Sequence, residues 1–163
     1  MSNPLTQHPA TSFPTPVISS DGRSISLLII HCSAVKPDQT SSARQIDRWH
    51  RQRGWNGIGY HYVVRRDGSI ETGRPEWQVG AHCAGHNQHS IGICYEGGLD
   101  ENGKPCDTRT EAQKRTLLYL LTLLKHRYPQ ALVTGHSTFA NKACPCFNAE
   151  QEYLTISNEK VGA

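Results

Sequence analysis

One short segment near the carboxyl end of the chain carries three side chains that could act together on a substrate. His136, Lys142 and Cys144 lie close together in the sequence, and His31 lies far upstream. Imidazole and thiolate are ligands that zinc prefers, and an ammonium group beside them can stabilise an anion. The segment therefore predicts a hydrolytic metal site assembled from distant parts of the chain.

The spacing of these residues favours a catalytic site over a structural one. Seven residues separate His136 from Cys144, which excludes ligation from adjacent turns of one helix, and Pro145 indicates a loop. With His31 the site has three protein ligands, so a fourth tetrahedral position is left for water. A zinc ion in such a site lowers the pKa of water toward about 7 and polarises a carbonyl group.

Other interpretations stay open from these residues alone. His31 could be a buried histidine whose hydrogen bonds are satisfied, and Cys144 a small apolar core residue. A rival cluster lies in a glycine-rich polar loop and comprises His82, Cys83, His86 and His89. Substrate contact or surface exposure explains that cluster better than a closed metal site. Cys144 and Cys146 could also ligate together, but the single proline between them makes a shared ion awkward.

The strands that must position these residues follow from the hydrophobic pattern. The continuous apolar run at 26–31 is typical of a strand buried on both faces, and it ends at His31. Arg66-Asp67-Gly68-Ser69 is a hairpin signal. Further strands are expected at 57–64, 70–73, 90–96 and 131–135.

Two main helices are expected between the strands. The first runs from residue 43 to the stop at Gly54, with a capping box from Ser42 to Gln45. The second covers residues 111–128 and is capped from Thr110 to Gln113, or from Thr108 to Glu111. The leucines of the second helix face several directions, which indicates a largely buried helix. The expected fold is a single α/β domain with a central mixed sheet flanked by α-helices.

Composition limits the classes of partner. A length of 163 residues fits one domain, and a net charge of +3 is too mild to indicate nucleic acid, so we expect no nucleic-acid partner. Residues 1–25 contain no secretory signal, so the six cysteines are expected as thiols or metal ligands rather than disulfides. No apolar run is long enough to cross a bilayer, and we expect no membrane partner.

Several short motifs occur in the order that they have in a known family. They are Ile30-His31-Cys32-Ser33-Ala34, Gly54-Trp55, Gly59-Tyr60-His61-Tyr62, Arg66-Asp67-Gly68, Val79-Gly80-Ala81-His82, Asn87, Ser90-Ile91-Gly92-Ile93 and Lys142-Ala143-Cys144-Pro145. Through these motifs, residues 26–150 resemble the zinc-dependent N-acetylmuramoyl-L-alanine amidases of the type 2 family. The resemblance is closest to the small phage lysozyme-amidases, whose fold is shared with peptidoglycan recognition proteins.

The resemblance implies a ligand set and two catalytic residues. It implies one Zn²⁺ per chain, held by His31, His136 and Cys144. Lys142 would stabilise the anion that develops when the lactyl carbonyl of muramic acid is attacked. Tyr60 would hydrogen-bond the attacking water or the tetrahedral intermediate. The sequence leaves open which of these two residues protonates the leaving L-alanine amine.

The resemblance also implies a substrate groove. His82 and Asn87 match positions that line the groove, and Trp55 lies near the start of its wall, although Trp55 could instead be a packing residue. His61 follows Tyr60, and strand alternation points it to the opposite face, so we expect it to be structural. Asn148 departs from the aspartate that many family members carry, which keeps a hydrogen bond but removes a charge.

The implied activity is hydrolysis of the amide bond between N-acetylmuramic acid and L-alanine in peptidoglycan or muropeptides. The alternatives are a non-catalytic peptidoglycan-binding module, or a phage amidase that also regulates an RNA polymerase. We expect a flexible arm at 1–25, the amidase catalytic domain at 26–157 and a tail at 158–163. A monomer is expected, cytoplasmic as synthesised. It would act on the cell wall once released or delivered, as an endolysin, a recycling enzyme or a secreted effector.

Overall fold

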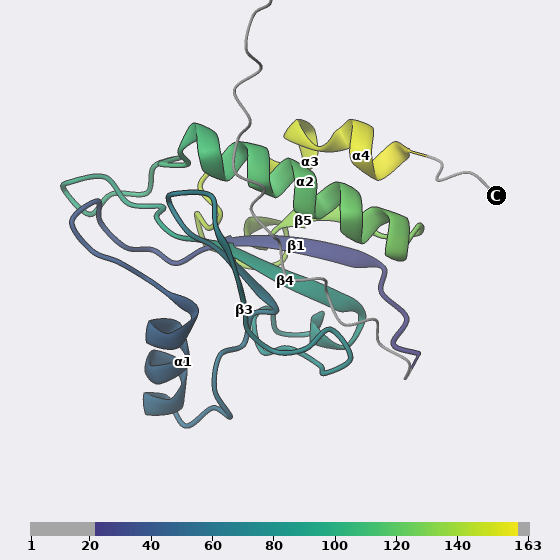
Figure 1. The fold of residues 1–163 in the computed structure, drawn as a ribbon, viewed down its shortest axis with the longest axis horizontal. Helices are drawn as coiled ribbons and strands as arrows, with labels where there is room; N and C mark the ends of the chain where they lie inside the picture. Colours follow the sequence, from purple (N-terminus) through teal and green to yellow (C-terminus); the bar gives the residue numbers. More distant parts are fainter. Residues whose placement is uncertain (1–21, 160–163) are drawn as a thin grey trace, which may run out of the picture.

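A single five-stranded sheet forms the centre of the protein. The computed structural model describes residues 22–159, and its strands lie in the order β3-β2-β4-β1-β5 (Figure 1). Their bounds are β1 Leu27–Cys32, β2 Tyr62–Val64, β3 Ile70–Thr72, β4 Ser90–Tyr95 and β5 Leu132–Gly135. The β2–β3 hairpin is antiparallel, and the other neighbours are parallel. The predicted mixed sheet is confirmed.

The central strands are buried on both faces, as the apolar run at 26–31 predicts. β1 lies between β4 and β5, and its register places His31 opposite Cys94 of β4. Alternate residues of β1 face opposite layers. Leu28 and Ile30 join the larger core cluster, whereas Ile29 and His31 point to the other face of the sheet. His31 thus sits at the carboxyl end of a strand held on both sides.

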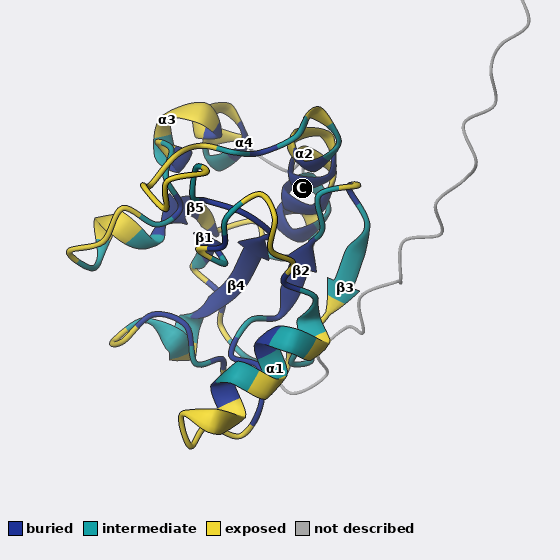
Figure 2. Cartoon of the chain, turned by 90° about the vertical axis from the view of Figure 1, so that its left-hand side faces the viewer, coloured by how far each residue is buried: buried dark blue, intermediate teal, exposed yellow. Residues whose placement is uncertain are grey.

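Helices cover the two faces unequally. Their bounds are α1 Ala43–Gln52, α2 Glu111–Arg127, α3 Ala149–Glu152 and α4 Leu154–Asn158. α2, α3 and α4 lie together over one face, and α1 lies on the opposite side (Figures 1 and 2). On that side Ile46 of α1 packs against Val63 of β2 and Cys94 of β4. α3 and α4 were not expected from the sequence.

The N-termini of α1 and α2 follow the predicted capping chemistry. Ser42 and Gln45 form a capping box on α1, and Thr110 and Gln113 form one on α2. Both helices begin where these boxes place them, because each box satisfies two backbone N–H groups that the start of the helix would leave unpaired. The other element bounds agree with the predicted ranges to within two residues, except at residues 57–64.

The predicted strand at 57–64 is too long. Only Tyr62–Val64 is a strand, and the preceding residues form an irregular segment. The amide of Gly59 donates to Nδ1 of His50 at 2.9 Å, and its carbonyl accepts from the amide of Ala81 at 3.0 Å. A Cβ at Gly59 would lie 1.9 Å from the Ala81 oxygen. The segment therefore pairs with a helix histidine and a loop, contacts that no local pattern reveals.

Part of the predicted N-terminal arm belongs to the fold. Ile25 is buried, and the guanidinium of Arg23 donates to the backbone carbonyls of Glu76, Asn87 and Ser90. Arg23 therefore links the residues just before β1 to the segment that precedes β4. Residues 1–21 of the arm and residues 160–163 of the tail lie outside the described part of the chain.

Substitution of a buried leucine in α2 should reveal how much stability this layer contributes. Leu121 is fully buried, whereas Leu118 in the same helix is 51% exposed. We expect Leu121→Ala to lower the free energy of unfolding by about 2–5 kcal/mol, since it removes buried methyl groups and leaves a cavity. Leu118→Ala is the matched control and should change it by less than about 1 kcal/mol. Equal losses in a urea titration would contradict this assignment of the core.

Candidate metal centre

Three donor groups of the type that binds zinc converge at one end of the sheet. Donor atoms of His31, His136 and Cys144 all lie within 4.8 Å of one another. His31 is near the carboxyl end of β1, and His136 directly follows β5, the parallel neighbour of β1. Because parallel strands end at the same edge, residues far apart in the sequence meet there. The grouping predicted from the sequence is thus assembled by the sheet.

The loop that carries Cys144 is held by several hydrogen bonds. The amide of Cys32 donates to Sγ of Cys144 at 3.3 Å, and the amide of Ser137 donates to its carbonyl at 2.8 Å. The hydroxyl of Tyr95 donates to the carbonyl of Pro145 at 2.6 Å. These bonds join the loop to β1, to the segment after β5 and to β4, so the thiol has a defined position.

A buried arginine, Arg109, packs against the same loop. The guanidinium of Arg109 lies 3.3 Å from the ring centroid of Phe147 and forms ion pairs with Asp107 and Glu152. The ion pairs hold the pKa of both carboxyl groups below their usual values. Asn148 caps α3 by accepting from the amide of Gln151, so the departure from aspartate falls at a helix cap.

The two histidines of the centre are held in the neutral form. Burial lowers the pKa of His31 well below its usual value, and His82, His136 and the Lys142 ammonium lower it further. Burial also lowers the pKa of His136, again with a contribution from Lys142. Neutral imidazole is the form that ligates a metal, because the ligating nitrogen must keep its lone pair. The donor set therefore fits zinc in type, and its two imidazoles also fit it in protonation.

Tyr60 lies beside this centre. Its ring centroid is 5.0 Å from that of His31, and the residue is half-buried. Burial raises the pKa of the Tyr60 phenol well above its usual value, and the thiols of Cys94 and Cys144 raise it further. The phenol is therefore protonated at neutral pH and can donate a hydrogen bond.

A hollow of about 340 Å³ opens next to the donor groups. Five of the residues singled out from the sequence line it, namely Trp55, His82, Asn87, His136 and Lys142. Lys142 is exposed, and Cys83, the aromatic ring of Phe139 and three alanines complete the lining. The predicted groove residues thus share one cavity with His136, one of the three predicted metal ligands, whereas His31 and Cys144 do not line it.

Within this cavity His82 and Asn87 have structural contacts. Oδ1 of Asn87 accepts from the amides of His82 and Cys83, both at 2.9 Å. His82 is buried, and its Nδ1 lies 2.8 Å from Nε2 of His31. Burial lowers the pKa of His82 to about 3, with further lowering from the nearby His61 and His136 and from Arg23 and Arg74. His82 therefore contacts a candidate ligand directly, which the sequence did not indicate.

The rival groupings are not assembled. In residues 22–159, the group of His31, His136 and Cys144 is the single cluster with metal-site spacing. Sγ of Cys146 lies 3.8 Å from Sγ of Cys32 instead of joining Cys144 in that cluster. All six cysteines are free, as the sequence predicts. His61 is fully buried, with its ring nitrogens paired to Gln78 and Gly92, in agreement with a structural role.

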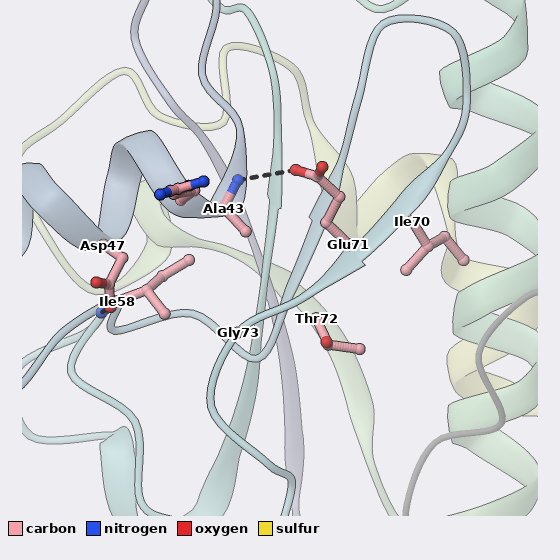
Figure 3. Close-up of a pocket in the computed structure, with 8 residues that line it drawn as sticks. Ala43, Asp47, Ile58, Ile70, Glu71, Thr72 and Gly73 are labelled. Atoms are coloured by element: carbon pink, nitrogen blue, oxygen red, sulfur yellow. Dashed lines mark hydrogen bonds between the residues drawn. The ribbon is translucent and has the colours of Figure 1, made fainter.

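A second hollow, of about 610 Å³, lies between α1 and β3 (Figure 3). Oε1 of Glu71 accepts from the amide of Ala43 at 2.8 Å there and so holds the first turn of α1 against β3. The side chain of Asp47 is similarly used, since Oδ1 accepts from the amide of Ile58. None of the predicted site residues lines this hollow. Its polar groups position α1, and the predicted site residues line the other cavity.

His50 supports the segment that carries Tyr60 in a way that the sequence only partly indicated. Its helical spacing put it on the apolar face of α1, and it is buried. Its ring centroid lies 4.5 Å from that of Trp55 and 5.6 Å from that of Tyr60. A histidine on an apolar stripe was the available signal, but its partners Trp55, Gly59 and Tyr60 come from the irregular segment that follows α1.

Comparison with known proteins agrees with this geometry. Residues 21–147 match the N-acetylmuramoyl-L-alanine amidase family. The chain is 43% identical over 124 residues to the endolysin of Escherichia phage T7, covering 76% of this chain and 82% of that protein.

Solved structures show the same architecture. The N-acetylmuramoyl-L-alanine amidase LysC of Clostridium intestinale is 32% identical, with a TM-score of 0.69 and coverage of 81% of this chain and 83% of that one. Drosophila PGRP-LB, at 24% identity, shares the fold with a TM-score of 0.69 and 86% coverage of each chain. The predicted resemblance and fold class are confirmed, and the chain belongs to the N-acetylmuramoyl-L-alanine amidase family.

Proposed function

We propose that the chain is a zinc-dependent amidase of the endolysin type, which hydrolyses the bond between N-acetylmuramic acid and L-alanine in peptidoglycan. One zinc ion would be held by His31, His136 and Cys144. The observation that carries this proposal is the convergence of two neutral imidazoles and a thiol within 4.8 Å, beside an open cavity. Three ligands of these types leave a coordination position for the reaction.

Lys142 and Tyr60 have separate roles beside the zinc ion in the proposed reaction. When bound, zinc supplies a Lewis acid that polarises the scissile carbonyl and lowers the pKa of water. The ammonium of Lys142, exposed in the cavity, stabilises the negative charge that develops on the carbonyl oxygen. The phenol of Tyr60 carries its proton at neutral pH and donates a hydrogen bond to the reacting oxygen atoms or the leaving nitrogen. The products are the lactyl carboxylic acid and the free amine of L-alanine.

The cavity walls suit a substrate that combines a sugar with a short peptide. Trp55 and Phe139 supply aromatic surface, and Ala81, Ala84 and Ala140 leave room between them. Trp55 is 39% exposed; its ring is tilted by 53° to the buried ring of His50, and the Arg53 guanidinium lies 5.8 Å from its centroid, so the exposed part of the indole is what a substrate could contact. Aromatic faces of this kind offer apolar contact to sugar rings, while the charged groups stay at the scissile bond.

The activity should depend on zinc. Purified protein incubated with peptidoglycan is expected to release L-alanine amino groups while the number of reducing ends stays constant, since no glycosidic bond is cut. Dialysis against a chelator should abolish the release, and one equivalent of Zn²⁺ should restore it. Binding to cell walls without any release of amino groups would instead support a recognition module. Full activity after chelation, with no zinc detected by mass spectrometry, would exclude the proposed metal site.

In residues 22–159 no helix has the length and apolar character needed to span a bilayer.

A further inference from the structure

A chain of buried hydrogen bonds leads from the candidate metal centre into the sheet. Nε2 of His31 lies 2.8 Å from Nδ1 of His82, and Nε2 of His82 lies 3.1 Å from Oγ of Ser90. His31 is 1% exposed, His82 is 8% exposed and Ser90 is fully buried. Bonds in such a position are shielded from water, so each partner strongly constrains the others.

The position of the protons follows from the direction in which each nitrogen points. Nδ1 of His31 faces Cys144, with 3.8 Å between Nδ1 and Sγ, so Nδ1 is the nitrogen available to a metal. Its lone pair must then be free, which leaves the proton on Nε2 of His31. With a metal on Nδ1 of His31, the tautomers that fit both short contacts have Nε2 of His31 donating to Nδ1 of His82, and Nε2 of His82 donating to Oγ of Ser90.

We infer that His82, supported by Ser90, is a positioning residue that fixes the ring orientation and tautomer of the ligand His31, rather than primarily a substrate-binding residue. The inference rests on the proposed zinc site. Metal-bound histidines generally donate their second N–H to an acceptor that holds the ring in place. Here the acceptor is a neutral imidazole, which orients the ligand without adding negative charge to the centre.

The surroundings of His82 are built to hold its ring in this one place. Its backbone amide donates to Oδ1 of Asn87 at 2.9 Å. Its ring lies directly over Gly92 of β4, where an added Cβ would come within 2.6 Å of two ring carbons. A Cβ on Gly80 would likewise lie 2.7 Å from Cδ2 of His82. The absence of a side chain at Gly80 and Gly92 leaves room for the His82 ring, and the hydrogen bond to Asn87 holds the backbone of His82 in place.

A measurement of zinc affinity distinguishes the positioning role of His82 from a role in substrate binding. Competition against a chromophoric chelator should show that His82→Ala protein binds zinc about 10- to 100-fold more weakly than wild type. His82→Asn keeps an acceptor near the position of Nδ1, so it should recover part of that loss. Ser90→Ala removes the distal acceptor and should weaken binding by about two- to tenfold. His89→Ala is the matched control, because the half-buried imidazole of His89 lies in the same segment but contacts His86 and not His31. The His89→Ala protein should bind zinc as wild type does.

Kinetics supply the second measurement. The amidase activity of His82→Ala should rise toward the wild-type value as zinc is added to saturation, with KM little changed. Thermal unfolding of each variant in excess chelator reports whether the apo fold is intact, and Ser90→Ala keeps the test available if His82→Ala unfolds. A folded His82→Ala protein with wild-type zinc affinity and a raised KM would overturn the inference while leaving the zinc site in place. Wild-type protein that binds no zinc would instead overturn the proposed function itself.

Discussion

Cys144→Ala protein is expected to lose its zinc and to fall in kcat by about 10³-fold or more. The thiol is one of three donor groups within 4.8 Å, and the two histidines that remain cannot complete a catalytic zinc site. A Lewis acid contributes several kcal/mol to stabilisation of the transition state, and each 1.4 kcal/mol corresponds to a factor of ten in rate. Zinc content by mass spectrometry and release of L-alanine amino groups measure the two losses separately. His136→Ala should behave in the same way.

Cys146→Ala is the matched control for the thiol. Cys146 lies in the same loop and is also half-buried, but its Sγ faces Cys32 and the carbonyl of Gly98. We expect this variant to keep one zinc per chain and a kcat within about threefold of wild type, since no donor group is removed. Equal losses of zinc in Cys144→Ala and Cys146→Ala would mean that the loop, and not the Cys144 donor, determines binding.

Lys142→Met is expected to lower kcat by about 10²–10³-fold while zinc stays bound. The substitution keeps an unbranched side chain of similar length and removes only the charge that faces the cavity. The loss of one group that stabilises the developing oxyanion typically costs this much in rate. Metal content and kcat should therefore separate in this variant, in contrast to Cys144→Ala.

Lys104→Met is the control for the loss of a positive charge. Lys104 is exposed in the loop before α2 and lines none of the cavities beside the centre. We expect its kcat to match that of wild type in the same buffer. A Lys142→Met protein with unchanged kcat and a raised KM would assign Lys142 to substrate binding. Tyr60→Phe in the same assay then shows whether the phenol contributes to the chemical step.

Local patterns predicted the elements that depend on local physics. The run at 26–31 is continuous and apolar because β1 is covered on both faces, and the capping boxes at Ser42 and Thr110 mark helix starts that the first turn itself requires. The prediction failed at residues 57–61, where Gly59 bonds to His50 and Ala81 instead of to a strand. Such contacts depend on which loop and which helix lie nearby, and no short window contains that information.

The sequence by itself determined the chemical inventory of the site. Two histidines, a lysine and a cysteine indicated a hydrolytic metal site, and the family order of the motifs around them indicated a metal-dependent amidase. Only the tertiary structure decided how they are arranged. It brought the ends of β1 and β5 together, so that His31, His136 and Cys144 share one centre. It also turned Cys146 toward Cys32, and it placed His82 against His31 over the open space at Gly92. The physical reason is that the type of each side chain can be read at its own position in the sequence. The proximity of residues about a hundred positions apart arises only when the sheet forms.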